Sequence, residues 1–388
     1  MSEENIETIE EGLVKIQIPS FEKVSSKAPV FYNSKMELNR DISILALKTF
    51  QKEINNEIAI CDVFGGSGIR GIRYKKEIDN VSDVVVNDIS SLAIEFGKIN
   101  ANINSLEIDF EQKEANILLR ENRGKFDVID IDPFGTPSYF VDSAGYSLKK
   151  DSLLCITATD TSALCGTYKE PCIRKYNSKP YKSEYCHENG IRILAGFVAL
   201  TLAKYKKYIE IKLSHSSEHY MRLYIKIKKG SAATDESLDN NIGYISHCKK
   251  CLYRIAISGI ASPIDELCPI CGEKIQIAGP LWIGKIQNHD FIDNMLNDLS
   301  NETTYLNTEN KIAKLLNSCL LEADAPITFY DVHVICKNLK ISAPKLDDII
   351  TKLEEEGFLA IKTHFNPIGI KSDVDIERFK EIILSLIK

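Results

Sequence analysis

Short β-branched runs alternate with helical patterns between residues 58 and 157, and this alternation leaves the chain few possible folds. The segment Ser90–Asn104 has apolar residues at the spacing of an amphipathic helix. Strands that alternate with helices predict βαβ units and a doubly wound, mostly parallel sheet, so we expect an α/β, Rossmann-like domain. The strand-like runs are Ile58–Phe64, Val84–Val86, Phe126–Ile131 and Leu153–Thr157.

Three neighbouring segments are expected to complete this domain. Tyr208–Leu213 and Tyr220–Ile227 are strand-like and could form an antiparallel edge pair. Asp160–His187 has no clear period, and a loop of this length in a compact domain is usually functional. Before the first strand, Asn39 or Asp41 could cap a helix.

The composition changes at Gly230–Asn241, where small and acidic residues gather. We place a domain boundary there, which gives a first domain of residues 1–241 and a smaller α+β domain of residues 242–388. The tail of the second domain, Thr328–Lys388, has two helical runs followed by a strand-like pair. That order resembles a winged helix-turn-helix.

The charge balance excludes a uniformly basic coat for nucleic acid, because the 388 residues carry a net charge of −7. Two segments are locally basic: residues 168–182 hold five bases and one acid, and residues 204–229 hold eight bases and two acids. The longest near-apolar run, Ile193–Ala203, has eleven residues, whereas a membrane span needs about 20. The N-terminus resembles neither a secretory signal nor a transit peptide, so we expect a cytoplasmic protein without a membrane partner.

A glycine-rich loop follows the first predicted strand and reads DVFGGSGIRG from Asp62 to Gly71. Asp88 lies 23 residues beyond Gly65, at the end of the next strand, where a carboxylate can bind both ribose hydroxyls of an adenosine. The acidic Asp62 suits a cofactor with a cationic methionine end, which favours S-adenosylmethionine over a nicotinamide dinucleotide. A ligand-free tight turn remains an alternative.

The tetrapeptide Asp132-Pro133-Phe134-Gly135 follows the apolar run at residues 126–131, at the strand end where ligands bind in such sheets. An exocyclic amine of a nucleobase is a poor nucleophile, because its lone pair is delocalised into the ring. A carboxylate and a nearby carbonyl that accept hydrogen bonds from the amine localise that lone pair, and the carboxylate can take the proton. We therefore predict Asp132 as the acceptor and base, with Phe134 stacking on the target ring.

Four of the eleven cysteines form two C-x-x-C pairs that are separated by sixteen residues. This spacing predicts a zinc site, and four thiolates make a closed tetrahedral site of the structural kind. The predicted ligands are Cys248, Cys251, Cys268 and Cys271.

Seven segments are specific enough to identify a family. They are Phe31–Asp41 (FYNSKMELNRD), Gly68–Arg73 (GIRGIR), Asp130–Pro137 (DIDPFGTP), Leu164–Tyr168 (LCGTY), Glu184–Glu188 (EYCHE), His219-Tyr220 and His364–Pro367 (HFNP). Together they resemble the tRNA (guanine-26-N2)-dimethyltransferase family in its archaeal form, over nearly the whole chain. The run Gly65-Gly66-Ser67-Gly68 departs from the family's usual Ser-Ala-Thr-Gly-like loop, and Ser372 replaces a usual Thr.

The resemblance implies an enzyme that transfers two methyl groups from S-adenosylmethionine to the exocyclic amine of a guanosine in tRNA. It also implies that the four cysteines bind structural zinc. The target base must leave its stack, as in other base-modifying enzymes, with Phe31 or Tyr32 helping Phe134 to stack it and the Pro133 carbonyl assisting Asp132. The implied cofactor-binding residues are Arg40, Arg70, Asp88, Glu114 and Ala115, beside Asp62 and Gly65 of the glycine loop.

Three other functions stay open at this point. A related enzyme could methylate the exocyclic amine of adenine in RNA or DNA, with the same sheet and a similar tetrapeptide. A noncatalytic zinc and winged-helix protein could bind nucleic acid without chemistry. A nicotinamide oxidoreductase would need a proton donor that the sequence does not offer. No obligate protein partner is expected.

Overall fold

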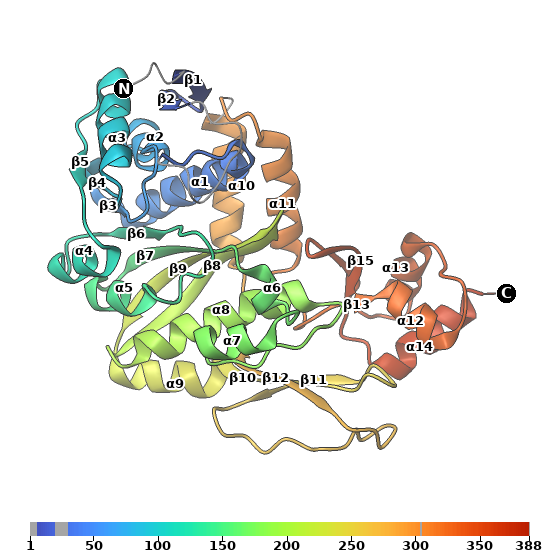
Figure 1. The fold of residues 1–388 in the computed structure, drawn as a ribbon. Coiled ribbons are helices and arrows are strands. Elements are labelled where there is room, and N and C mark those ends of the chain that lie inside the picture. Colours follow the sequence, from blue (N-terminus) through green and yellow to red (C-terminus); the bar gives the residue numbers. More distant parts are fainter. Residues whose placement is uncertain (1–5, 20–29, 303–304, 388) are drawn as a thin grey trace. The chain divides into compact units, whose positions relative to one another are not determined.

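A computed structural model of the chain describes residues 6–19, 30–302 and 305–387 (Figure 1). Within these ranges, no helix is both long enough and apolar enough to cross a membrane. The chain divides into two compact units, and the boundary that we expect at residue 241 stays a prediction. The first unit is Met1–Thr157, Tyr224–Lys229 and Asp290–Asn317, and the second is Ala158–Leu223, Gly230–His289 and Ser318–Lys388.

The largest sheet has seven strands in the order β5-β4-β3-β6-β7-β9-β8. The pairs β5/β4, β4/β3, β3/β6 and β6/β7 are all parallel, and Ile60 pairs with Val84 on one side and Val128 on the other. Every residue of β3, β6 and β7 is buried, so both faces of these strands are covered, as their continuous apolar runs predict. The α/β fold is thus confirmed. The strands are β3 (Ile58–Asp62), β4 (Val81–Asn87), β5 (Asp109–Glu111), β6 (Val128–Ile131), β7 (Ser152–Ala158), β8 (Lys207–Ser217) and β9 (Tyr220–Lys229).

The order of the strands fixes where a ligand can bind. The chain leaves β3 towards β4 and β5, and then returns to β6 on the other side of β3. Ligands of open α/β sheets bind outside the carboxyl ends of the strands at such a switch point. The helices that connect these strands are α2 (Ile69–Glu77), α3 (Ser91–Ile103), α4 (Ala115–Glu121) and α5 (Val141–Ser147), and a short 3-10 turn, η1 (Ser34–Met36), leads into α1 (Glu37–Ile54).

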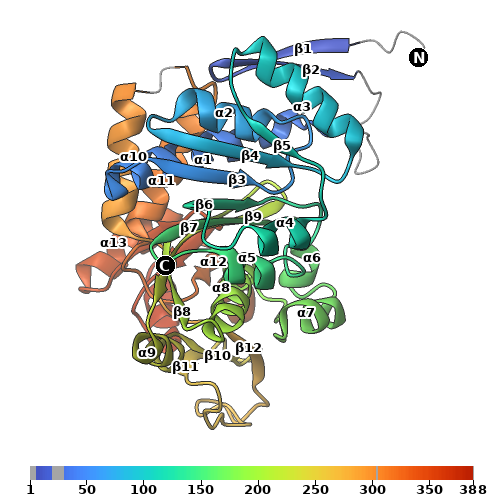
Figure 2. The ribbon, with the colours of Figure 1, turned by 90° about the vertical axis from the view of Figure 1, so that its left-hand side faces the viewer.

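An N-terminal hairpin, which the sequence reading missed, lies along α3 (Figure 2). Its strands are β1 (Ile6–Glu11) and β2 (Val14–Pro19), paired antiparallel. The side-chain oxygen of Asn100 in α3 accepts from the backbone N–H of Gln17 at 2.6 Å. Its side-chain nitrogen donates to the backbone carbonyl of Gln17 at 3.0 Å. The hairpin is therefore attached through backbone groups that helix α3 satisfies.

The segment that we expected to be one long loop, from residue 160 to residue 187, contains two short helices. They are α6 (Thr161–Leu164) and α7 (Lys169–Tyr176), and the long helix α8 (Cys186–Ala203) follows. The Asp160 carboxylate accepts from Lys175 at 3.0 Å and from the Tyr176 hydroxyl at 2.7 Å, which anchors the end of α7. The many polar residues of α7 and its Pro171 leave no clear helical periodicity in the sequence. Pro171 lies in the first turn of α7, where its missing N–H costs no helical hydrogen bond.

The C-terminal part begins after α9 (Ser231–Asn241) with a three-stranded antiparallel sheet of order β11-β10-β12. Helices α10 (His289–Glu302) and α11 (Glu309–Leu321) precede the tail. In the tail, two helices are followed by a strand pair, as the winged-helix-like pattern predicts. A third strand before the first helix, which gives the order β13-β15-β14, and a last helix were not predicted. The elements are β10 (Ile242–His247), β11 (Arg254–Ser258), β12 (Gln276–Trp282), β13 (Tyr330–Asp331), α12 (Val332–Leu339), α13 (Leu346–Glu355), β14 (Ile361–Thr363), β15 (Asn366–Lys371) and α14 (Ile376–Ser385).

Candidate active site

The glycine loop after β3 is tied to the end of β4 by short contacts. Asp88 accepts hydrogen bonds from the backbone N–H groups of Gly66 and Ser90, both at 2.9 Å. A side chain at Gly65 would place its Cβ 2.3 Å from Val86, so only glycine allows this close approach. Gly65 and Asp88, both predicted to bind cofactor, thus lie together at the carboxyl ends of β3 and β4.

Asn87, which the sequence reading missed, connects a third strand end to this corner. Its buried side-chain amide donates to the carbonyls of Val63 and Lys113, both at 3.1 Å, and accepts from the Lys113 N–H at 3.0 Å. Asn87 thus holds the backbone of Lys113, and Glu114 and Ala115 follow directly at the start of α4. Glu114 caps that helix, because its carboxylate accepts from the backbone N–H groups of the second and third helical residues.

The predicted base Asp132 and the predicted cofactor residue Arg70 form an ion pair. The guanidinium of Arg70 donates to Oδ2 of Asp132, and it also contacts Asn39 Oδ1 at 2.8 Å and Ser43 Oγ at 3.2 Å. Asn39 therefore lies inside α1 and holds Arg70, rather than capping the helix as the sequence suggested. No residue in the described part of the chain donates to Oδ1 of Asp132, so that oxygen is left for another donor.

Asp62, the last residue of β3, is only 1% exposed. Its carboxylate accepts from the Gly71 N–H at 3.1 Å, at the start of α2. Burial raises the pKa of Asp62 to about 7, while Arg70 opposes that rise and the neighbouring Asp130 and Asp132 add to it. Asp62 is thus one of three carboxyl groups that share the positive charge of Arg70.

Arg40 and Tyr32 are both held by a second missed residue, Glu11 of the N-terminal hairpin. Glu11 accepts from Arg40 Nε at 2.6 Å and Nη2 at 2.5 Å, from Arg73 Nη1 at 2.8 Å and from the Tyr32 hydroxyl at 3.1 Å. Burial acts to raise the pKa of Glu11, but the two arginines outweigh burial and lower it. The hairpin therefore delivers the carboxylate that orients Arg40.

Two aromatic rings meet at the tetrapeptide Asp132–Gly135, one of them its own Phe134. The rings of Phe31 and Phe134 meet edge to face with centroids 4.4 Å apart, and Phe134 is 54% exposed. The Phe31 carbonyl accepts from the Ser67 N–H at 3.2 Å, which fixes Phe31 against the glycine loop. An exposed ring next to a carboxylate oxygen suits a planar ligand with an amine at its edge.

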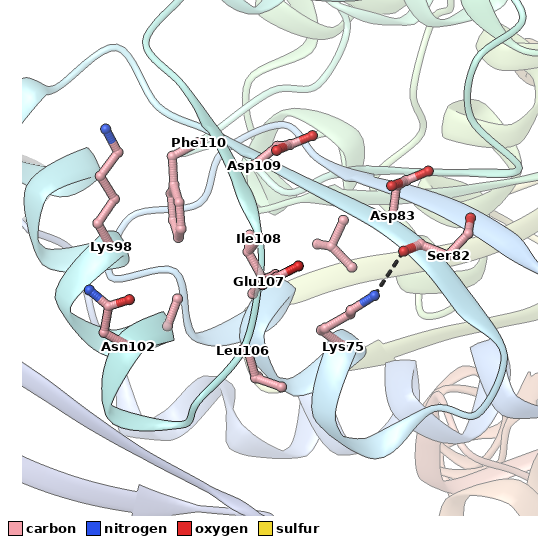
Figure 3. Close-up of a pocket in the computed structure, with 12 residues that line it drawn as sticks. Lys75, Ser82, Asp83, Lys98, Asn102, Leu106, Glu107, Ile108, Asp109 and Phe110 are labelled. Carbon is pink, nitrogen blue, oxygen red and sulfur yellow. Dashed lines mark hydrogen bonds between the residues drawn. The ribbon is translucent and has the colours of Figure 1, made fainter.

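A hollow of about 590 Å³ lies elsewhere in the same unit, between α3 and strands β4 and β5 (Figure 3). Lys75, Lys98, Asp83 and Phe110 are among the residues that line it, and Lys75 donates to the Ser82 carbonyl at 2.8 Å. Ser82 and Asp83 are at the amino-terminal end of β4, opposite to the ligand-binding edge of such a sheet. None of the predicted site residues lines this hollow.

The four paired cysteines come together in the second unit. Sγ of Cys248 is 3.5 Å from Sγ of Cys271, and Sγ of Cys251 is 3.4 Å from Sγ of Cys268. Each pair sits in a matching turn: the Leu252 N–H binds the Cys248 carbonyl and the Gly272 N–H binds the Cys268 carbonyl, both at 2.9 Å. Two ligand atoms of one tetrahedral zinc ion are about 3.3–3.8 Å apart, so this donor set fits the metal.

Comparison with known proteins decides the family. Residues 12–384 match the family described as N2,N2-dimethylguanosine tRNA methyltransferase. The chain belongs to this family. A protein of Methanobrevibacter smithii named tRNA (guanine(26)-N(2))-dimethyltransferase is 64% identical over 387 residues, which cover 100% of this chain and 99% of the relative.

Other members of the N2,N2-dimethylguanosine tRNA methyltransferase family agree. A protein of the same name from Methanothermobacter thermautotrophicus is 50% identical over 379 residues, covering 98% of this chain and 99% of that protein. The solved structure of Trm1 from Pyrococcus horikoshii in complex with S-adenosyl-L-methionine matches with a TM-score of 0.87 at 34% identity, covering 97% of this chain and 99% of that chain. The resemblance read from the seven segments is confirmed.

Proposed function

We propose that this chain is a tRNA (guanine-26-N2)-dimethyltransferase that uses S-adenosylmethionine. The observation that carries the proposal is that no described residue donates to Oδ1 of Asp132, which follows the parallel strand β6. The same tetrapeptide carries the exposed ring of Phe134, which meets the ring of Phe31 edge to face. The names of the relatives, at up to 64% identity over the full chain, supply the substrate. Cytoplasmic location stays a prediction.

The cofactor would bind at the corner formed by the ends of β3, β4 and β5. When bound, S-adenosylmethionine supplies a methyl group on a cationic sulfur, and the Pyrococcus relative was solved with this compound. Asp88, at the end of β4, would accept from the ribose hydroxyls, and the segment at Glu114–Ala115 would border the adenine. Arg70 contacts Asn39, the residue before Arg40 in α1, and the two guanidinium groups would hold the carboxylate of the methionine end.

The target amine would be held by the chain's own acceptors. Arg70 binds one oxygen of Asp132 and keeps the carboxylate fixed, so Oδ1 can accept an N–H of the amine and take the proton as the C–N bond forms. Phe134, with Phe31 at its edge, would stack on the guanine ring after the base leaves the helix. A monomethylated amine retains one N–H, so a single acceptor oxygen suffices for the second transfer.

We also propose that Cys248, Cys251, Cys268 and Cys271 bind one structural zinc ion. The sulfur distances of 3.4 and 3.5 Å and the paired turns support this. Four thiolates leave no open position, so the metal would hold the loops of the β10–β12 sheet rather than take part in methyl transfer.

The experiment that tests the function is transfer of labelled methyl groups to an unmodified tRNA transcript, followed by digestion to nucleosides. We expect label in N2,N2-dimethylguanosine with the wild-type chain and a loss of at least about a hundredfold in rate with Asp132→Asn, which removes the proton acceptor but keeps the shape. Cofactor binding by calorimetry is the control and should persist in the variant. Label in methyladenosine, or none on tRNA while the cofactor still binds, would contradict the proposal.

A further inference from the structure

A second group of potential metal ligands, distinct from the four paired cysteines, lies in the second unit. Cys165 follows α6, and Cys186 and His187 are the first two residues of α8. Sγ of Cys165 is 3.9 Å from Nδ1 of His187, and the two sulfurs and one ring nitrogen all lie within 4.8 Å of one another. Cys165 is buried, whereas Cys186 and His187 are partly exposed, so an ion could enter from solvent.

We propose that Cys165, Cys186 and His187 bind a second zinc ion. Two thiolates and an imidazole are the donors that zinc prefers, and they exclude the hard cations magnesium and calcium. The spacing of 3.9 Å is close to the separation of about 3.5 Å that a sulfur and a nitrogen have on one tetrahedral zinc ion, so small side-chain rotations close the site. The position of Cys186 at the start of an 18-residue helix favours its thiolate form.

The fourth position of this ion faces a serine. Ser216 Oγ is 3.2 Å from Nδ1 of His187, so a water molecule beside this hydroxyl would complete the tetrahedron. Cys172, although buried in the neighbouring helix α7, is outside the ligand group. The site therefore has three protein ligands and one exchangeable position, in contrast to the closed set of four cysteines.

The proposed ion would join two ends of one basic segment. Residues 166–185 lie between the two cysteine ligands and carry Lys169, Arg174, Lys175, Lys179 and Lys182. A metal ion bound to both cysteines would hold α6 and the start of α8 together. It would thereby restrict the conformations that the segment between them can adopt.

Metal content per chain is the direct test. The full-length protein is purified with zinc, dialysed against metal-free buffer that contains a reductant, and analysed by mass spectrometry of the metal. We expect two zinc ions per wild-type chain, one in the double variant Cys165→Ser with Cys186→Ser, and two in the matched control Cys172→Ser. With cobalt in place of zinc, the thiolate charge-transfer absorption should fall by about a third in the double variant, because six thiolate ligands become four.

His187→Asn guards against misfolding, because it keeps both thiols and changes a partly exposed side chain. This variant should retain one tightly bound ion and bind the second at least about tenfold more weakly in a zinc titration. One zinc ion per wild-type chain, unchanged in all variants, would overturn the proposal. So would nine titratable thiols in place of eleven in unfolded, metal-free, unreduced protein, with both cysteines found in a disulfide by peptide mapping.

Discussion

At the scale of single residues, the exposed ring of Phe134 is the feature most directly matched to a nucleobase. Stacking of a base on an aromatic side chain is worth about 1–3 kcal/mol. We therefore expect Phe134→Ala to raise the KM for tRNA by roughly tenfold to a hundredfold, with the Kd of S-adenosylmethionine unchanged. Phe134→Tyr, which keeps a ring, should retain most of the affinity.

The control for this prediction is Tyr139→Ala. Tyr139 is an exposed aromatic of the same segment, at 67% exposure, but it packs against Phe140 and not against the Phe31 ring. An equal rise in KM for both alanine variants would show that Phe134 has no special role.

Glu188 gives a second residue-scale prediction, on stability against pH. Its buried carboxylate accepts from Lys371 at 2.7 Å, Arg192 Nε at 2.9 Å and the Thr328 N–H at 2.9 Å. Burial acts to raise the pKa of Glu188, but Lys371 and Arg192 outweigh it and lower the pKa to about 2, from 4.5. Since the folded pKa is the lower one, the network stabilises the fold above pH 4.5 and is lost as the pH falls towards 2.

Glu188→Gln should lower the free energy of unfolding at pH 7 by about 3–5 kcal/mol, because two buried cations lose their anion. The difference in urea midpoint between wild type and variant should shrink as the pH falls through the range from 4.5 to about 2. Glu236→Gln, on the exposed face of α9, should leave the midpoint unchanged. A constant difference at all pH values would disprove the role of ionisation.

At the scale of elements, the N-terminal hairpin matters because of one side chain. Glu11 at the end of β1 is 1% exposed and binds Arg40 and Arg73. Glu11→Gln should destabilise the chain by about 1–3 kcal/mol and weaken cofactor binding, since Arg40 loses its charged partner. Glu10→Gln, the adjacent residue with a side chain 69% exposed, is the matched control. Equal melting midpoints and equal cofactor Kd values for the two variants would argue against this link.

The elements that the sequence predicted are those whose burial fixes their composition. β3, β6 and β7 are covered on both faces, so their runs are continuously apolar and easily recognised. β5 escaped notice because it has only three residues, of which two are acidic. The hairpin escaped because β1 carries three glutamates among its six residues, two of them exposed, and so lacks the clear apolar alternation of a strand.

The residues of the candidate site also divide into those that the sequence could predict and those that it could not. Asp88, Asp132 and the glycine loop carry local signals, namely a strand end, a specific tetrapeptide and a glycine spacing. Glu11 and Asn87 carry none, because their roles arise from partners 29 and 26 residues away. Asn39 was misread as a cap for the same reason, since its partner Arg70 is 31 residues away.

At the scale of the whole molecule, the charge distribution constrains how tRNA is bound. The chain has a net charge of −7, so attraction to phosphates must come from local segments. The tail, residues 290–388, has 17 acids and 11 bases, which makes its winged-helix-like fold a poor general polyanion site. In contrast, α7 and the residues after it expose Lys169, Arg174 and Lys182.

We expect the triple change of Lys169, Arg174 and Lys182 to Gln to weaken tRNA binding. The slope of log Kd against log salt should fall by about two to three, because each phosphate that is no longer neutralised lowers it by nearly one. Changing Lys337, Lys340 and Lys345 to Gln removes the same charge from exposed positions of the acidic tail, and should leave the slope nearly unchanged. Fluorescence anisotropy at four salt concentrations measures both slopes. A larger fall in slope in the second variant would assign tRNA binding to the tail, since counterion release reports the number of phosphates neutralised wherever the net charge lies.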